Sequence, residues 1–152
     1  MNRLRTSMLA VLTLLVLTLL PMQVLAQASA ASVNDRLEIQ EKLLYAYAYT
    51  YDSKDCVSFS NLFTADAVLD VSEKRIGRDA ILQGCIAQQN SVVGNIKTRH
   101  NMMNIVFDQL TPSRAETRTY LLLTWQKPGD QFPAIRLAAT YRDVIVKSGP
   151  AI

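Results

Sequence analysis

The sequence predicts an α+β fold in which helices come first and long antiparallel strands follow. Apolar residues recur at helical spacing between residues 33 and 51, and again between residues 79 and 92. From residue 98 onward apolar and polar residues alternate, and two turns that each contain a proline divide this stretch into strands. Helices followed by a run of strands are typical of domains whose helices cover one face of a sheet.

Residues 1–26 are predicted to form a cleavable export signal. Arg3 and Arg5 precede an apolar run over residues 8–20, and Ala26 ends a segment of the kind that signal peptidase cuts. An uncleaved membrane anchor is the alternative, but Pro21 interrupts the run before it reaches the about 20 residues that span a bilayer. We therefore expect a periplasmic or secreted protein with no stable membrane anchor after cleavage. Residues 27–34 would be a flexible leader and residues 35–152 the folded domain.

The composition of the chain excludes several kinds of partner. Cleavage would remove two of the 16 basic residues and none of the 13 acidic ones, so the net charge of +3 would fall to about +1. No cluster of lysine and arginine follows the signal, and nucleic acid is not expected as a partner. With one histidine in the chain, a histidine-rich metal site is excluded, and we expect neither a metal nor another cofactor.

Two cysteines, Cys56 and Cys85, would face an oxidising compartment after export. They allow one disulfide, but the sequence does not show whether their Cα atoms lie within bridging distance. Each also sits where a small buried residue would fit. Two buried thiols are therefore slightly favoured over a bridge.

The first long helix is predicted over residues 33–51, and Asp52 begins the polar segment that ends it. Residues 45–51 alternate tyrosine with smaller residues, as a strand would, but the strong helix formers over residues 38–44 favour a helix. A helix would divide four tyrosines between two faces, Tyr47 with Tyr51 and Tyr45 with Tyr49.

Shorter elements are predicted between residues 57 and 95. A second helix fits residues 57–63, with Phe59, Leu62 and Phe63 inward, and a strand fits residues 67–71. Gly77 marks a turn before a third helix, which Asp79 would cap. The inner face of that helix would contain Ile81, Cys85 and Val92.

Three strands are predicted over residues 98–108, 115–126 and 134–147. Because side chains alternate between the faces of a strand, the first strand should have two distinct faces. One face would contain His100, Met102, Asn104 and Val106, and the other Arg99, Asn101, Met103, Ile105 and Phe107.

Periodicity alone favours structural roles for the residues that could carry chemistry. His100 would be a core or rim histidine, and Asp52 a solvated carboxylate or a cap for the next helix. Asp52 also lies at the end of its helix where the dipole disfavours an acid, so it must gain another interaction there. Trp125 would be a core residue, and Arg99, Arg118, Arg136 and Arg142 would face solvent, with Arg142 able to turn inward at an open sheet edge.

Several spaced motifs resemble the SnoaL-like family of the nuclear transport factor 2-like superfamily, in its scytalone dehydratase and dehydrochlorinase-like branch. The resemblance runs from about Leu37 to Gly149. It rests on Tyr47-x-x-x-x-Asp52-x-x-Asp55, Phe59-x-x-x-Phe63-Thr-Ala-Asp66-Ala67, Gly77-Arg78-Asp79-Ala80-Ile81, His100-x-x-x-Asn104-x-x-Phe107 and Ala138-Ala139-Thr140-Tyr141-Arg142-Asp143. Each motif is loose, and their order and spacing together give the specificity.

The resemblance implies a cone-shaped α+β barrel, with N-terminal helices packed on a curved, mostly antiparallel sheet that encloses a pocket. Family members include dehydratases, a dehydrochlorinase, polyketide cyclases and isomerases. By this resemblance Asp52 and His100 would form a catalytic dyad, and Tyr47 would polarise the substrate. The residues expected to bind the substrate are Tyr51, Phe63, Met102, Asn104, Tyr141 and Asp143.

The implied chemistry is proton abstraction without a cofactor. A neutral imidazole is a useful base near neutral pH because its ordinary pKa is about 6.5. A buried aspartate that accepts from one ring nitrogen fixes the tautomer, so the other nitrogen can take a proton from a carbon beside a carbonyl or leaving group. The resemblance thus implies a lyase or isomerase that acts on a small, largely apolar molecule.

One departure from the family pattern concerns the C-terminus. Family members usually continue through a Gly-Trp turn into a final strand, which often carries a pocket arginine, but this chain ends at Ile152. The predicted barrel therefore lacks the final strand, through truncation or with an edge that is open or covered by a partner. A non-catalytic pocket for a small molecule, or a domain that forms a homodimer or trimer, is the alternative function. The sequence leaves the substrate undetermined.

Overall fold

A computed structural model of the protein describes residues 33–147. They fall into two compact units that divide between Ile39 and Gln40, and each is described by itself. In the first unit residues 33–39 are helical, including Val33 and Asn34 of the predicted leader. The predicted export signal and residues 148–152 lie outside the described residues. Within residues 33–147 no helix has the length and apolar character needed to cross a membrane.

The second unit begins with two consecutive helical segments. The second of them ends at Asp52, one residue after the predicted end of the first long helix. A π-helical segment, η1 (Gln40–Tyr45), leads into α2 (Ala46–Asp52). Tyr49 is 76% exposed, whereas Tyr47 and Tyr51 pack edge-on against Phe59 at centroid distances of 5.1 and 5.2 Å. The predicted division of the tyrosines between two faces is therefore confirmed. The wider π-helical turn was not predicted from the pattern.

A disulfide joins the next two helices, α3 (Cys56–Asn61) and α4 (Arg78–Gln89). The preference for two free thiols was therefore wrong, because the fold brings the Cα atoms of Cys56 and Cys85 to 5.6 Å. That separation lies within the usual bridging range. Together with Phe59 and Ile81, the two cysteines form the buried core of this helical layer.

Two predictions about α4 (Arg78–Gln89) were wrong. Asp79 lies in its first turn and does not cap it. Gly77 takes the N-cap position with a φ of 90°, a backbone conformation that glycine adopts at little cost. Val92 is not on the inner face, because α4 ends at Gln89 and Val92 begins a short 3₁₀ helix, η2 (Val92–Asn95), where it is 84% exposed.

A small hairpin precedes α4. It pairs β1 (Val68–Asp70) with β2 (Lys74–Ile76) in antiparallel register. The first of these strands was predicted, and the second was not. With three residues each, both strands are too short for alternation to be a strong signal.

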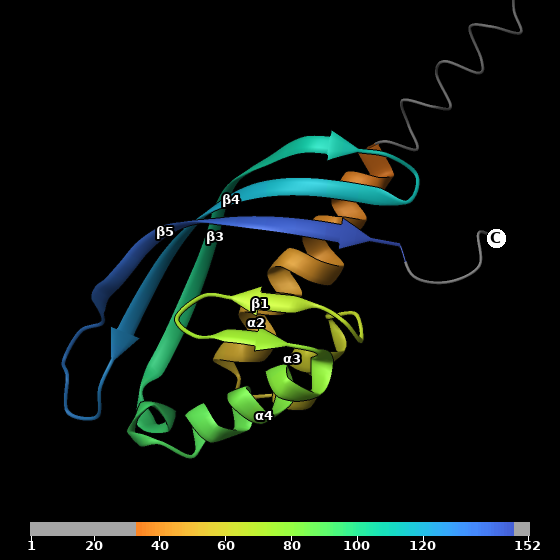
Figure 1. Ribbon diagram of the computed structural model, residues 1–152. Helices are drawn as coiled ribbons and strands as arrows, with labels where there is room; N and C mark the ends of the chain where they lie inside the picture. The colour runs from red at the N-terminus through yellow and green to blue at the C-terminus, as the bar shows by residue number, and fades with distance from the viewer. Residues whose placement is uncertain (1–32, 148–152) are drawn as a thin grey trace, which may run out of the picture. The chain divides into compact units, whose positions relative to one another are not determined.

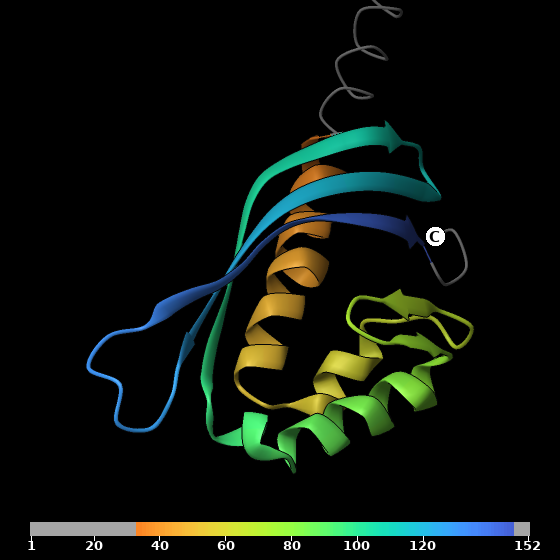
Figure 2. The same ribbon diagram turned by 60° about the vertical axis from the view of Figure 1, so that its left-hand side comes forward.

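The main sheet has the order β3-β4-β5 and is antiparallel throughout. Its strands are β3 (Lys97–Leu110), β4 (Arg114–Gln126) and β5 (Ala134–Val146), which confirms the three predicted strands. The strands bend over the helices, so that the concave face of the sheet looks toward α2 (Figures 1 and 2). The prediction of an α+β fold with helices on one face of a curved sheet is confirmed.

A β-bulge reverses the faces of β3 halfway along its length. Between Met103 and Val106 the strand advances by three residues while β4 advances by two. Asn104, with a φ of 51°, lies in this bulge and is exposed. The predicted face shared by His100, Met102, Asn104 and Val106 is therefore wrong beyond Met102. An extra residue in one strand moves the side chains that follow it to the other face. In β3 this holds up to a further register shift between Phe107 and Gln109.

Candidate functional site

The last residue of α2 contacts the inner face of β3 through a compact set of hydrogen bonds. The Nδ1 atom of His100 lies 2.7 Å from Oδ1 of Asp52. The backbone N–H of His100 donates to Oδ2 of the same carboxylate at 2.8 Å, and the Thr98 hydroxyl donates to Oδ1 at 2.7 Å. The structure thus brings together the acid and the imidazole that the resemblance singled out.

This arrangement explains why an acid is stable at the C-terminal end of a helix. The helix dipole disfavours a negative charge there, and hydrogen bonds from Thr98 and His100 offset that cost. Thr98 and His100 are two residues apart on β3, so both side chains point to the same face of the strand. Both contacts therefore follow from the register of one strand.

The pair is shielded from water and the carboxylate stays charged. The side chains of His100 and Asp52 are 6% and 10% exposed. Burial alone would raise the pKa of Asp52, but the hydrogen bonds from His100 and Thr98 outweigh it, so that the pKa lies below its ordinary value. Asp52 is thus held as an acceptor for the imidazole N–H.

Tyrosine rings form a wall beside the imidazole. The ring of Tyr51 lies 5.1 Å from that of His100, and the ring of Tyr47 lies 6.1 Å from it, both edge-on. The Tyr51 hydroxyl donates to the side-chain carbonyl of Gln88 on α4. Burial is the main cause that raises the pKa of Tyr47 and of Tyr51 above the ordinary value, so both phenols remain protonated.

A second acid lies farther along the concave face. Tyr47 also packs against Tyr141 of β5 at 5.7 Å, and Asp143 follows two residues later on the same strand face. The Thr117 hydroxyl of β4 lies 3.4 Å from Oδ2 of Asp143. Burial raises the pKa of Asp143, and the Thr117 hydrogen bond opposes this only in part. The face therefore has a charged carboxylate at one end and a carboxyl with a raised pKa at the other.

Replacing Asp143 with asparagine should increase stability more at neutral pH than at acidic pH. A raised folded-state pKa means that the protonated carboxyl stabilises the fold at low pH, and that this contribution is lost as the pH rises through the folded pKa. Asparagine resembles the protonated carboxyl and does not titrate. Urea unfolding of both proteins at about pH 4 and about pH 7 measures the difference.

The control for this prediction is Asp108→Asn, for which the expected sign is opposite. The pKa of Asp108 is lowered by Arg118, whose guanidinium donates to both carboxylate oxygens at 2.7 Å. Its contribution is present above the ordinary carboxyl pKa and is lost as the pH falls, so this variant should lose stability mainly at neutral pH. Equal effects of Asp143→Asn at both pH values would contradict the assignment.

Of the other predicted binding residues, two lie near the dyad and one does not. Phe63 packs against Tyr47 at a centroid distance of 6.3 Å, and half-buried Met102 shares the inner face of β3 with His100. Asn104 is exposed in the bulge, and no contact places it beside the dyad. Among residues 33–147 no group of three or more His, Cys, Asp or Glu side chains is arranged to hold a metal ion.

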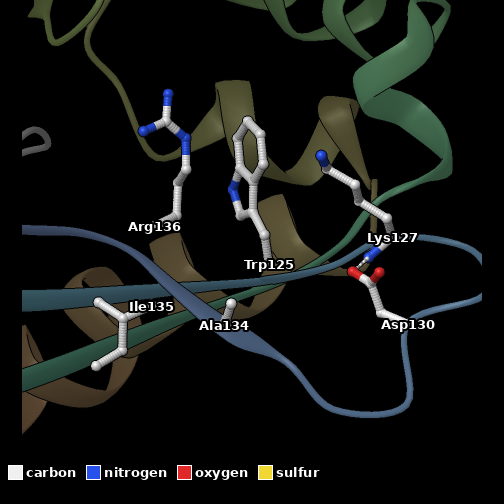
Figure 3. Close-up of a pocket in the computed structure, with 6 residues that line it drawn as sticks. All are labelled: Trp125, Lys127, Asp130, Ala134, Ile135 and Arg136. Atoms are coloured by element: carbon white, nitrogen blue, oxygen red, sulfur yellow. Dashed lines mark hydrogen bonds between the residues drawn. The ribbon is translucent and has the colours of Figure 1, made fainter.

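A hollow of about 490 Å³ opens at the end of the β4–β5 hairpin (Figure 3). It is lined by Trp125, Lys127, Asp130, Ala134, Ile135 and Arg136. The guanidinium carbon of Arg136 lies 5.0 Å from the centre of a Trp125 ring. Arg136 is exposed, as predicted, and its guanidinium also lies beside an aromatic ring.

Sequence reasoning missed several residues of this region. Thr98, Thr117 and Gln88 each bond to a predicted site residue, and Arg136 lines a hollow. Period-two alternation was enough to find Thr98, because it lies two residues before His100. No local signal identifies the other three, which meet their partners only through tertiary packing.

Comparisons with known proteins agree with this architecture. A sequence profile described as the SnoaL-like domain matches residues 31–149. No curated protein sequence matches the chain. Among solved structures, an NTF2-like protein with a cystatin-like fold from Novosphingobium aromaticivorans is similar with a TM-score of 0.69 and 20% identity, covering 81% of this chain and 79% of that one.

Two further structures are similar at the level of fold. A protein of unknown function from Mycobacterium tuberculosis aligns with a TM-score of 0.68 and 19% identity, covering 79% of this chain and 67% of that one. A proposed scytalone dehydratase from Novosphingobium aromaticivorans aligns with a TM-score of 0.63 and 21% identity, covering 78% of each chain. The fold is thus one that a proposed dehydratase also adopts.

Proposed function

The chain belongs to the SnoaL-like domain family, and on this basis we propose that it is a cofactor-independent lyase or isomerase. Its substrate would be a small, largely apolar molecule with an acidic C–H beside a carbonyl group. The observation that carries this proposal is the hydrogen bond of 2.7 Å between Asp52 and the ring of His100 in a shielded position.

In the proposed mechanism His100 is the base and Asp52 holds it in place. When Nδ1–H donates to the Asp52 carboxylate, the lone pair is on Nε2, which no hydrogen bond links to another residue within 33–147. Nε2 takes a proton from the substrate carbon, and the electron pair of the broken C–H bond forms an enolate. The proton then returns to another carbon in an isomerisation, or leaves with a β-hydroxyl as water in an elimination.

The tyrosines support the same proposal because they supply donors and an apolar wall. Tyr47 and Tyr141 meet edge-on at 5.7 Å, and burial raises the pKa of each phenol. A protonated phenol can donate to the oxyanion of an enolate without losing its own proton. The aromatic rings around His100 favour an apolar substrate body.

The disulfide supports the proposal that the domain works outside the cytoplasm. Bridges such as Cys56–Cys85 persist in the periplasm or outside the cell and are rare in the reducing cytoplasm. Together with the signal-like sequence of residues 1–26, this favours an exported protein. Cell fractionation followed by mass determination of the mature N-terminus would test export and cleavage.

Deuterium uptake from D₂O tests the proposed activity on a panel of candidate compounds. Small ketones and β-hydroxy ketones with apolar substituents are incubated with the protein, and exchange of the hydrogen beside the carbonyl is followed by proton NMR. We expect exchange above the buffer rate for a subset of them, and none with the unfolded protein. Binding of these compounds with no exchange would favour the non-catalytic alternative.

A further inference from the structure

The hollow at the β4–β5 hairpin is lined by side-chain donors for which residues 33–147 supply no hydrogen-bond acceptor. The side chains of Trp125, Lys127 and Arg136 point to one side of the hairpin, and Ile135 points to the other (Figure 3). The indole Nε1 of Trp125 is out of contact with water and has no hydrogen-bond partner among the described residues. Such a buried N–H has a cost, which an acceptor from a ligand would remove.

The two cations of this hollow are not neutralised by ion pairs. The salt bridges within residues 33–147 use other side chains, and neither Arg136 nor Lys127 takes part in one. Asp130 is the acid that lines the hollow, and its carboxylate accepts from the backbone N–H of Lys127 at 2.8 Å. Two cations thus line the hollow against a single acid, which is tied to the turn.

A bulge in β5 gives Arg136 its position. Leu123 pairs with Leu137 and Thr124 pairs with Ile135, so that Arg136 is the extra residue of β5. Its guanidinium carbon lies 5.0 Å from the centre of a Trp125 ring, within the range of a cation–π interaction. A planar fork beside an apolar ring suits a carboxylate attached to an apolar body.

The strand register places this hollow beside the dyad. Trp125 pairs with Thr98, whose hydroxyl bonds to Asp52, and His100 pairs with Leu123. Trp125 and His100 are therefore diagonal neighbours on one face of the sheet, with backbones about 7–8 Å apart. A ligand held against Trp125 would therefore lie on the sheet face that also holds His100.

We propose that Trp125, Lys127 and Arg136 bind the carboxylate of a small organic acid with an apolar, preferably aromatic, body that extends toward His100. This inference rests on the proposed function and specifies its substrate class as anionic. Arg136 provides the fork, Lys127 adds charge, and Trp125 gives a flat apolar contact and one further N–H. None of these residues takes part in the proton transfer itself.

The single tryptophan of the chain reports on this site directly. Its fluorescence and its indole N–H resonance are followed during titration with 3-phenylpropanoate, and with 3-phenylpropanamide as the neutral probe of nearly equal shape. We expect saturable changes with the acid and at least about tenfold weaker binding of the amide, the size of effect that a charge-assisted hydrogen bond gives. Equal binding of the two probes would overturn the inference.

Arg136→Gln is the decisive variant, and Arg142→Gln is its matched control. Arg142 lies on the same strand but pairs with exposed Arg118, so the control removes the same charge from the outer face of the sheet. Arg136→Gln should weaken binding of the acid about tenfold or more and leave the amide unchanged, with partial recovery in Arg136→Lys. Equal losses of acid binding in both glutamine variants would show that the effect comes from the net charge of the protein. That result would contradict a carboxylate site at Arg136.

Failure of this inference can be told apart from failure of the proposed function. In His100→Ala the preference for the acid over the amide should persist, since the carboxylate site does not use the imidazole. Deuterium exchange of neutral ketones with no selective acid binding would overturn the anion site and leave the function. Selective acid binding with no exchange of any compound would overturn the proposed function and leave the anion site.

Discussion

The His100→Ala variant should lose about 10²–10⁴-fold in the rate of deuterium exchange and remain folded. The loss follows from the removal of the base, because the described residues offer no second imidazole beside the dyad; the chain has one histidine in all. The fold should survive because His100 is a strand residue whose backbone pairing with Leu123 does not need the ring. Circular dichroism and the urea midpoint check the fold, and NMR exchange rates check the chemistry.

Asp52→Asn should lower the rate by a similar factor through the orientation of the base. The carboxylate accepts at both oxygens, from the His100 ring and from the backbone N–H of His100. An asparagine keeps one acceptor oxygen and places an NH₂ group where the second acceptor was, so the imidazole loses its fixed tautomer or the backbone N–H loses its partner. Because the two residues act as a unit, the double variant should be no slower than the slower single one.

Asp55→Asn provides the matched control for this pair. Asp55 lies three residues after Asp52, is exposed, and accepts from the backbone N–H of Ser58 as the N-cap of α3. Asparagine caps helices about as well as aspartate, so exchange and stability should be nearly unchanged. If His100→Ala and Asp52→Asn both exchanged deuterium at the rate of Asp55→Asn, the dyad would have no catalytic role.

Loss of the disulfide should have a large effect on stability. Replacing Cys56 and Cys85 together with alanine is expected to lower the free energy of unfolding by roughly 3–4 kcal/mol, because the bridge closes a sequence separation of 29 residues. For a domain of this size that corresponds to a fall in Tm on the order of 10–20 °C. Urea and thermal unfolding of the variant against the oxidised protein give both values.

Reductant supplies an internal control for the disulfide prediction. A reducing agent should destabilise the original protein toward the double variant and leave the double variant itself unchanged. A loss of less than about 1 kcal/mol would show that the unfolded chain gains little freedom when the bridge opens. Free thiols in protein purified without reductant would contradict the bridge itself.

The bridge also has a consequence for the site. It ties α3 to α4, and α4 holds Gln88, which accepts from the Tyr51 hydroxyl beside the His100 ring. A looser α4 would release this wall of the site while the dyad keeps its own hydrogen bonds. The reduced protein should therefore lose substrate affinity before it loses the rate at saturation.

The sequence by itself determined the three long strands and the inward face of the first long helix. Helical spacing and strong helix formers were enough to separate Tyr47 and Tyr51 from Tyr45 and Tyr49, and alternation was enough to find the three long strands. These features depend on side chains a few residues apart, whose positions follow from one local backbone period. The motifs of the family added the pairing of Asp52 with His100, which no local period contains.

Only the tertiary structure decided which residues finally meet. The bulges at Asn104 and Arg136 depend on pairing between strands, and they turned Asn104 outward and placed Arg136 over Trp125. The disulfide depends on the packing of α3 against α4, because Cα atoms of residues 29 positions apart must come within 5.6 Å. The periodicity of the sequence does not encode such contacts. One extra residue in a strand, or a different packing of two helices, changes which side chains meet.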